Sequence, residues 1–200
     1  MTDSRTIITV ILLSISFISF GQRRNNGQKK GLYFIHFEHS WGANFNNWML
    51  EDEATNAGYE YNSPQHRYPA TGITLQRFMN SRLALTMTYS MQFLQYWSQF
   101  DNNAVGRTDW HLFTIALGAR YTWRDRGILY QYFDISLGYT YANVNTVDWT
   151  EEFPEPSNLS LPAFHVTALG SRIGKKYGVE LGLGYGYKGI LNLGFFFRLN

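Results

Sequence analysis

Apolar and polar residues alternate strictly through most of this sequence, and that alternation constrains the fold more than any other feature. It is clearest over residues 82–97, RLALTMTYSMQFLQYW, where every second side chain from Leu83 to Phe93 is apolar. The residues between them carry mostly hydroxyl or amide groups. Because successive side chains of a β-strand point to opposite faces, the segment has one apolar face and one polar face. The pattern predicts a strand that separates two media.

The same alternation recurs in seven other segments. The eight predicted strands cover residues 31–41, 70–79, 82–97, 109–123, 127–141, 161–172, 177–187 and 189–199. Each is long enough to supply the ~9–11 residues with which a tilted strand crosses a bilayer. The second segment loses its alternation at residues 77–79, which predicts a bulge or a strand end there. A membrane protein without spanning helices must close its strands into a barrel, because lipid cannot hydrogen-bond to unpaired backbone groups.

The predicted connections alternate between long and short. Residues 42–69, 98–108 and 142–160 form the long ones, residues 80–81, 124–126 and 173–176 form the short ones, and the last is a tight turn at Lys188. Long outer loops and short periplasmic turns are typical of bacterial outer-membrane barrels. Acidic residues predominate in the long loops, whereas basic residues predominate in the short turns and in residues 23–30. The basic side would face anionic phospholipid headgroups, and the acidic side would face lipopolysaccharide.

The first residues predict export. Residues 6–20, TIITVILLSISFISF, follow Arg5 and precede Gly21, which is typical of a secretory signal peptide. The run is shorter than the ~20 apolar residues of a spanning helix, although an uncleaved anchor is the alternative. We expect a cleaved signal peptide over residues 1–22, a basic periplasmic tail over residues 23–30 and a barrel over residues 31–200, in the bacterial outer membrane. The chain has no cysteine, which excludes an acylated lipoprotein, disulfides and thiolate metal sites.

Aromatic residues make up 18% of the chain, and many fall near the predicted strand ends. Tyr and Trp favour membrane interfaces because their rings are largely apolar but can form a hydrogen bond at one edge. The predicted outer rim contains Trp41, Trp97, Trp110, Tyr141 and Tyr187, and the predicted inner rim contains Tyr121, Trp123, Tyr177 and Phe197. The alternative is a soluble barrel or sandwich, whose apolar faces would point inward. The rims, the signal peptide and the loop lengths favour the membrane barrel.

The last predicted strand supplies a resemblance to a known family. Its apolar residues are Leu191, Leu193, Phe195, Phe197 and Leu199, a terminal strand of the kind that the barrel-assembly machinery recognises. With the export signal, this pattern resembles the small outer-membrane β-barrel family typified by the membrane domain of OmpA and by OmpX. The resemblance covers residues 31–200 and implies an eight-stranded, antiparallel, up-and-down transmembrane barrel. It implies no catalytic residues, and the final Leu199-Asn200 departs from the family's usual aromatic end.

The polar faces of the predicted strands give a candidate site inside the barrel, because an eight-stranded barrel is filled by side chains rather than by water. The predicted polar network of the lumen contains His36, Glu38, Arg120, Asp134, Glu180 and Arg198. Strand direction brings Arg120, Glu180 and Arg198 toward the periplasmic end, which predicts an Arg–Glu–Arg cluster. We expect these charges to pair as a structural plug. A gated conduit for a small solute is the alternative.

A catalytic set is a further hypothesis, because some small barrels of this architecture are lipid A hydrolases. His36, Glu38 and Ser40 share the inner face of the first predicted strand. Alternate residues of one strand lie roughly 6.6 Å apart, too far for a hydrogen-bonded relay without a partner from another strand. No EF-hand pattern, phosphate loop or dinucleotide fingerprint occurs in the sequence. We therefore expect no enzymatic activity, no catalytic residues, no bound metal and no cofactor.

The expected function is a structural, surface-interaction or envelope-complex role. The expected partners are outer-membrane lipid, lipopolysaccharide, the barrel-assembly machinery and an envelope protein, and a net charge of only +2 gives no reason to expect nucleic acid. Trp149 and Phe153 lie in an acidic loop, where exposed aromatics often mark recognition, so they are the predicted loop contacts. A narrow channel for small solutes and a lipid A-modifying hydrolase are the alternative functions.

Overall fold

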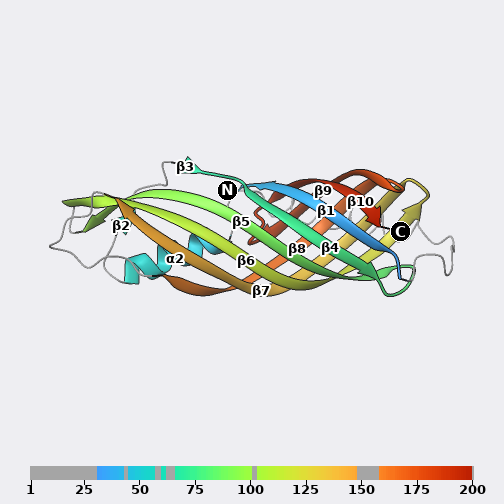
Figure 1. The fold of residues 1–200 in the computed structure, drawn as a ribbon, viewed down its shortest axis with the longest axis horizontal. Helices are drawn as coiled ribbons and strands as arrows, with labels where there is room; N and C mark the ends of the chain where they lie inside the picture. The colour runs from blue at the N-terminus through green and yellow to red at the C-terminus, as the bar shows by residue number, and fades with distance from the viewer. Residues whose placement is uncertain are drawn as a thin grey trace, which may run out of the picture.

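Eight strands form a closed antiparallel barrel (Figure 1). The computed structural model describes residues 31–42, 45–56, 60–61, 66–100, 103–147 and 158–199. The barrel strands are β1 (Tyr33–Trp41), β4 (Ala70–Phe78), β5 (Leu83–Phe100), β6 (Asn103–Arg126), β7 (Leu129–Val147), β8 (Leu159–Gly174), β9 (Tyr177–Gly186) and β10 (Leu191–Leu199). Each barrel strand pairs with the next one along the chain, and β10 pairs with β1 to close the ring. The predicted eight-stranded up-and-down barrel is confirmed.

The alternation in the sequence determines which side chains point out of the wall. Apolar side chains face outward and stay exposed, with Leu117, Leu137 and Tyr139 at 66%, 65% and 69%. Hydroxyl side chains such as Thr88 and Thr140 are buried inside. The soluble barrel with an apolar interior requires the opposite orientation, so that alternative is wrong for this chain.

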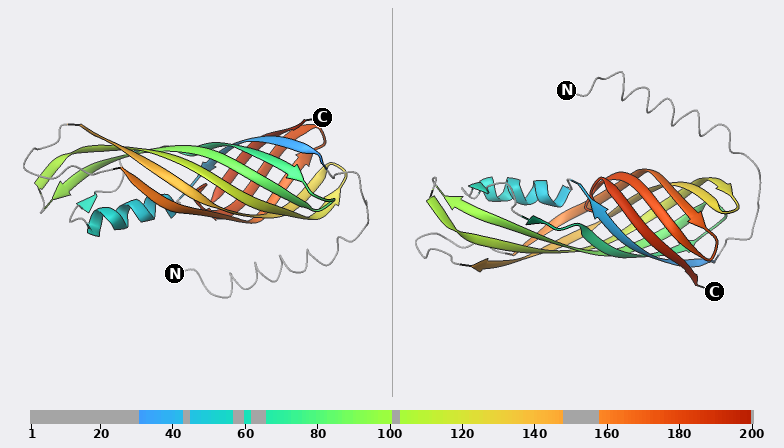
Figure 2. Two further views of the ribbon diagram at one scale, coloured as in Figure 1. Left: turned by 60° about the horizontal axis from the view of Figure 1, so that its bottom comes forward. Right: turned by 90° about the horizontal axis from the view of Figure 1, so that it is seen from above.

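Four neighbouring strands are much longer than the other four. β5, β6, β7 and β8 contain 18, 24, 19 and 16 residues, whereas β1, β4, β9 and β10 contain nine or ten. Figure 1 shows the long strands continuing past the closed ring, away from the C-terminus. We call this the extended end, and the opposite end, which carries the short turns, the turn end. The helix α2 (Phe45–Asn56) lies beside the extended strands (Figures 1 and 2).

The extended end corrects the predicted loops. Residues 98–108 are largely a hairpin, because β5 continues to Phe100 and β6 begins at Asn103. The predicted loop 42–69 contains α2 and two short strands, β2 (Glu60–Tyr61) and β3 (His66–Arg67), which both pair with β5. β7 continues to Val147, inside the predicted loop 142–160. No helix among the described residues is long and apolar enough to cross a membrane.

Three predictions lie outside the described residues. These are the signal peptide over residues 1–22, the basic tail over residues 23–30, and the loop contacts Trp149 and Phe153. They stay predictions.

The turn end differs from the predictions in two details. Residues 124–126 belong to β6, and the turn follows at Gly127, whose φ of 70° suits glycine. The predicted strand end at residues 77–79 is confirmed, because β4 ends at Phe78. The alternation is not lost there: Arg77 is exposed on the outward face and Phe78 is buried on the inward face. The alternation of polarity is hidden here because the outward residue is charged and the inward residue is aromatic, although the strand itself is regular.

Two of the predicted rim aromatics lie inside the barrel instead. Trp110 and Tyr187 are only 2% and 1% exposed. Trp110 shares the inward face of β6, and Tyr187 follows Gly186, whose φ of 139° turns the chain inward. Of the remaining rim residues, Trp123 is partly exposed, and Trp41, Trp97, Tyr141, Tyr121, Tyr177 and Phe197 are exposed as expected.

Candidate functional site

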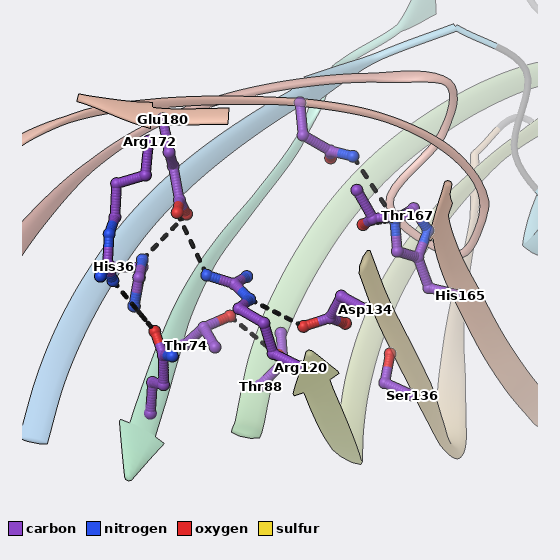
Figure 3. Close-up of polar contacts among 12 residues, drawn as sticks. His36, Thr74, Thr88, Arg120, Asp134, Ser136, His165, Thr167, Arg172 and Glu180 are labelled. Carbon is purple, nitrogen blue, oxygen red and sulfur yellow. Dashed lines mark hydrogen bonds and ion pairs between the residues drawn. The ribbon is translucent and has the colours of Figure 1, made fainter. Parts of the chain in front are cut away.

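A chain of ion pairs crosses the middle of the lumen (Figure 3). Arg120 of β6 lies 3.0 Å from Asp134 of β7 through its Nε and 3.2 Å from Glu180 of β9 through its Nη1. Glu180 in turn lies 2.9 Å from Nδ1 of His36 on β1. All four side chains are buried. The structure therefore brings together four of the six residues of the predicted polar network.

The fifth residue, Glu38, has a partner that the sequence prediction missed. Nζ of Lys188 donates to Oε2 of Glu38 at 2.5 Å. The sequence places Lys188 in the last connection of the barrel, a tight turn. The residues flanking that turn, Gly186 and Gly189, have φ of 139° and 90°, a region that L side chains rarely adopt. These two glycines fold the turn inward, so that the lysine is buried in the lumen.

The sixth residue, Arg198, is not part of the network, and Arg172 takes its place. Arg198 is partly exposed at the turn end, whereas Arg172, the last residue of the predicted strand 161–172, is buried. β8 has a bulge at Ala168, which shifts its pairing with β9 and changes which side chains point inward. The predicted Arg–Glu–Arg cluster is therefore wrong in its third member. The buried charges balance, with Arg120, Arg172 and Lys188 against Glu38, Asp134 and Glu180.

Arg172 also closes the turn end of the lumen. Its guanidinium carbon lies 4.5 Å from the ring centroid of Phe34, 4.6 Å from that of Tyr130 and 4.8 Å from that of Phe196. A cation over aromatic faces is attracted by their quadrupoles. Its Nη1 donates to Oε1 of Gln76 at 3.4 Å, and that oxygen lies 2.8 Å from the histidine of the ion-pair chain. The turn end thus has an aromatic plug that is joined to the polar network.

Hydroxyl and amide groups fill the lumen between the ion pairs and the extended end. The contacts join Thr74 to Thr88 at 2.8 Å, Thr114 to Thr140 at 2.7 Å and Ser136 to Tyr187 at 3.3 Å. A cavity of about 10 Å³ lies among Glu38, Arg120, Tyr132 and Lys188. That volume is room for roughly one water molecule. The interior is packed, as expected for eight strands.

The polarity of the wall reverses at the extended end. On the outward face, one row of paired residues is apolar: Met91, Phe113 and Tyr141. Four residues nearer the extended end, the paired residues are polar: Gln95, Asp109 and Asn145. On the inward face, the row of Ser90, Thr114 and Thr140 is followed by the row of Leu94, Trp110 and Val144. Below this level the barrel is apolar outside and polar inside, apart from the aromatic plug at the turn end. At the next rows, Gln95, Asp109 and Asn145 make the same strands polar outside, and Leu94, Trp110 and Val144 make them apolar inside, whereas the outward row of Trp97, Arg107 and Val147 beyond them is mixed.

The outward polar row is held by its own contacts. Nε2 of Gln95 donates to Oδ1 of Asp109 at 2.9 Å, and Nη2 of Arg107 donates to Oδ2 of Asp109 at 3.3 Å. All three side chains are partly exposed. Charged and amide groups arranged this way on an outer surface are suited to water rather than to hydrocarbon.

Helix α2 covers the inward face of the extended strands. Leu50 is 1% exposed and packs with Leu94, Trp110 and Leu112. Nδ2 of Asn46, one turn earlier on the same face, donates to Thr114 at 3.5 Å. α2 therefore closes the extended end of the lumen with an apolar core.

The trio considered for hydrolysis does not form a relay. His36 contacts Glu180 and Gln76, Glu38 contacts Lys188, and Ser40 donates to Asn192. His36 is fully buried. Across the described part of the chain, no group of three or more His, Asp or Glu residues could hold a metal ion.

Comparisons with models of known protein families and with curated proteins find no match to this chain. The site is therefore interpreted from its own geometry. Two signals in the sequence could have revealed more of it. The predicted network held three carboxylates against two arginines, so a third buried cation was missing. Adjacent apolar pairs, such as Phe93-Leu94 and Leu112-Phe113, mark the level at which the two faces exchange polarity.

Proposed function

We propose that this chain is a non-enzymatic outer-membrane protein whose barrel anchors a small water-exposed domain at the cell surface. The domain consists of the extended parts of β5–β8 together with α2. Its role is contact with a ligand or with another envelope component. The proposal keeps the expected surface-interaction role and the resemblance to small outer-membrane barrels, and it assigns that role to one part of the molecule.

The reversal of wall polarity carries this proposal. An exposed apolar face is favourable only against an apolar medium, and an apolar core under a polar outer face is what a water-exposed domain requires. On β5 the outward apolar residues run from Leu83 to Phe93. Ten residue steps cover ~34 Å along a strand, or ~26 Å along the barrel axis at a tilt of ~40°. Outer-membrane barrels present an apolar band of about 25 Å, so the level of the reversal fits one membrane surface.

The filling of the lumen favours an anchor over a channel. Arg172 and the aromatic rings around it, such as that of Phe34, close the turn end of the lumen. Leu50 closes the extended end together with the apolar side chains on which it packs. Between them lie balanced ion pairs and a cavity with room for roughly one water. The hydrolase alternative gains no support from the described residues, since His36 does not contact Ser40.

Cell fractionation tests membrane location. The chain is expressed in a Gram-negative host, and the outer-membrane fraction is run on a gel with and without boiling. We expect the chain in that fraction and a faster band in the unheated sample, because a folded barrel resists unfolding by detergent. A soluble periplasmic product would refute the proposal.

Thiol labelling tests the orientation. Because the chain has no cysteine, Asn145→Cys at the extended end and Lys175→Cys at the turn end each introduce a single thiol. Both positions are exposed. A membrane-impermeant maleimide applied to intact cells should label Asn145→Cys, and should label Lys175→Cys only after the outer membrane is permeabilised. The opposite result would place the extended domain in the periplasm and refute a surface role.

A further inference from the structure

A groove of about 300 Å³ lies on the outward face of the barrel near the turn end. Its outward-facing lining residues come from five adjacent strands, β10, β1, β4, β5 and β6, and include Tyr33, Leu75, Arg77, Leu85, Met87 and Leu117. The register pairs Tyr33, Arg77 and Leu85 in one row of the sheet. Leu75, Met87 and Leu117 form a second row, two residues nearer the middle of the barrel. The groove therefore runs from the turn-end rim into the apolar band.

Arg77 gives this otherwise apolar groove a positive end. Its side chain is exposed, and its guanidinium carbon lies 5.5 Å from the ring centroid of Tyr33. No carboxylate among the described residues pairs with it. Neighbouring Arg82 differs, because its Nη1 already donates to the Tyr121 hydroxyl at 3.2 Å. The groove thus combines an unpaired guanidinium with an apolar surface. Together they are complementary to a ligand that has an anionic headgroup and an acyl chain.

We infer that this groove binds one anionic glycerophospholipid from the leaflet next to the turn end. The phosphate lies at the Arg77 guanidinium, whose planar array of donors matches phosphate oxygens. One acyl chain lies along Leu75, Met87 and Leu117. The inference rests on the proposed function, since only a membrane-embedded barrel meets lipid here. Phospholipid rather than lipopolysaccharide is the occupant, because the turn end faces the periplasmic leaflet in the proposed topology.

Native mass spectrometry of the purified full chain in detergent micelles tests the inference. The protein is mixed with equimolar phosphatidylglycerol and phosphatidylethanolamine. We expect wild type to retain one phosphatidylglycerol, and Arg77→Gln to retain about fivefold less. Met87→Trp should lower retention of both lipids, because the indole ring is larger than the methionine side chain and fills the groove. Arg82→Gln is the control for charge, and Leu181→Trp, an exposed position on β9, is the control for added bulk; both should retain lipid as wild type does.

Three outcomes would overturn the inference. They are equal retention of the two lipids by wild type, an equal loss in Arg77→Gln and Arg82→Gln, and displacement of phosphatidylglycerol by equimolar lipid A. Folding of each variant is checked by the mobility of the unheated band. A folded barrel that inserts into vesicles but retains no phosphatidylglycerol overturns the lipid site and leaves the proposed function standing. A chain that does not insert overturns both.

Discussion

Replacement of Arg120 by methionine should destabilise the barrel strongly. The change removes the cation 3.0 Å from Asp134 and 3.2 Å from Glu180, while Glu180 keeps His36 at 2.9 Å. Asp134 is therefore the carboxylate left without its cation. Removing one partner of a buried ion pair costs about 3–5 kcal/mol, because the remaining charge stays desolvated. We expect the free energy of unfolding of Arg120→Met to fall by about that amount.

A second change should restore part of the loss. Asp134→Asn removes the stranded charge, so the double variant Arg120→Met/Asp134→Asn should be more stable than the sum of the two single effects by about 1–3 kcal/mol. The matched control is the partly exposed pair Arg107 and Asp109, whose atoms lie 3.3 Å apart on the outer face. Arg107→Met/Asp109→Asn should show a coupling of at most ~1 kcal/mol, because solvent screens that pair.

Urea unfolding of the barrel in lipid vesicles, followed by tryptophan fluorescence and by the mobility of unheated protein, measures these free energies. All variants are measured in one lipid composition. Additive effects of Arg120→Met and Asp134→Asn to within ~0.5 kcal/mol would refute the reasoning. An equally strong coupling in the exposed control pair would refute it as well.

Three further predictions test other parts of the structure. Gly170→Ala places a methyl carbon 2.2 Å from the ring of Tyr132, so unfolding in urea should show a loss of about 1–3 kcal/mol from overpacking; an unchanged midpoint contradicts this. Leu50→Ala should cost about 2–5 kcal/mol in the packing of α2, seen as faster proteolysis of the helix while the unheated band keeps its mobility; equal proteolysis contradicts it. Leu137→Arg should cost about 2–4 kcal/mol in vesicles, because it puts a charge in the apolar band, whereas Asn145→Arg should cost ~1 kcal/mol or less; equal costs contradict the boundary.

The wall of the barrel could be predicted from the sequence, because the strand period of two appears directly as alternating polarity. The extended domain could not. Just beyond Phe93 the strand continues, but the outward residue Gln95 is polar and the inward residue Leu94 is apolar. The alternation therefore looks interrupted, and the sequence predicts loops from residues 98 and 142, where the structure continues β5, β6 and β7 as strands. Helix α2 lies in the predicted loop 42–69, and its Asn46, Met49 and Leu50 pack into the interior.

The candidate site was predictable only where the strands are regular. His36, Glu38, Arg120, Asp134 and Glu180 were assigned to the lumen from the phase of their strands, and the structure buries all five there. Two local irregularities concealed the remaining cations. The bulge at Ala168 reverses the phase before Arg172, and the positive-φ glycines around Lys188 turn that residue inward. Neither irregularity can be recognised in the alternation of polar and apolar residues. The predicted network did contain three carboxylates but only two arginines, which indicated that a buried cation was missing.

The level at which the wall leaves the membrane is the central claim, and single cysteines along the outward face of β7 measure it most directly. Leu137, Tyr139, Tyr141, Asn143 and Asn145 are all exposed and differ only in height along the strand. Each is replaced in turn by cysteine, and labelling by a water-soluble maleimide is timed in intact vesicles and again in denaturant. We predict that positions 137–141 stay unlabelled until the barrel is unfolded in denaturant, and that positions 143 and 145 react at once. Equal labelling rates at Leu137→Cys and Asn145→Cys in intact vesicles would contradict the account.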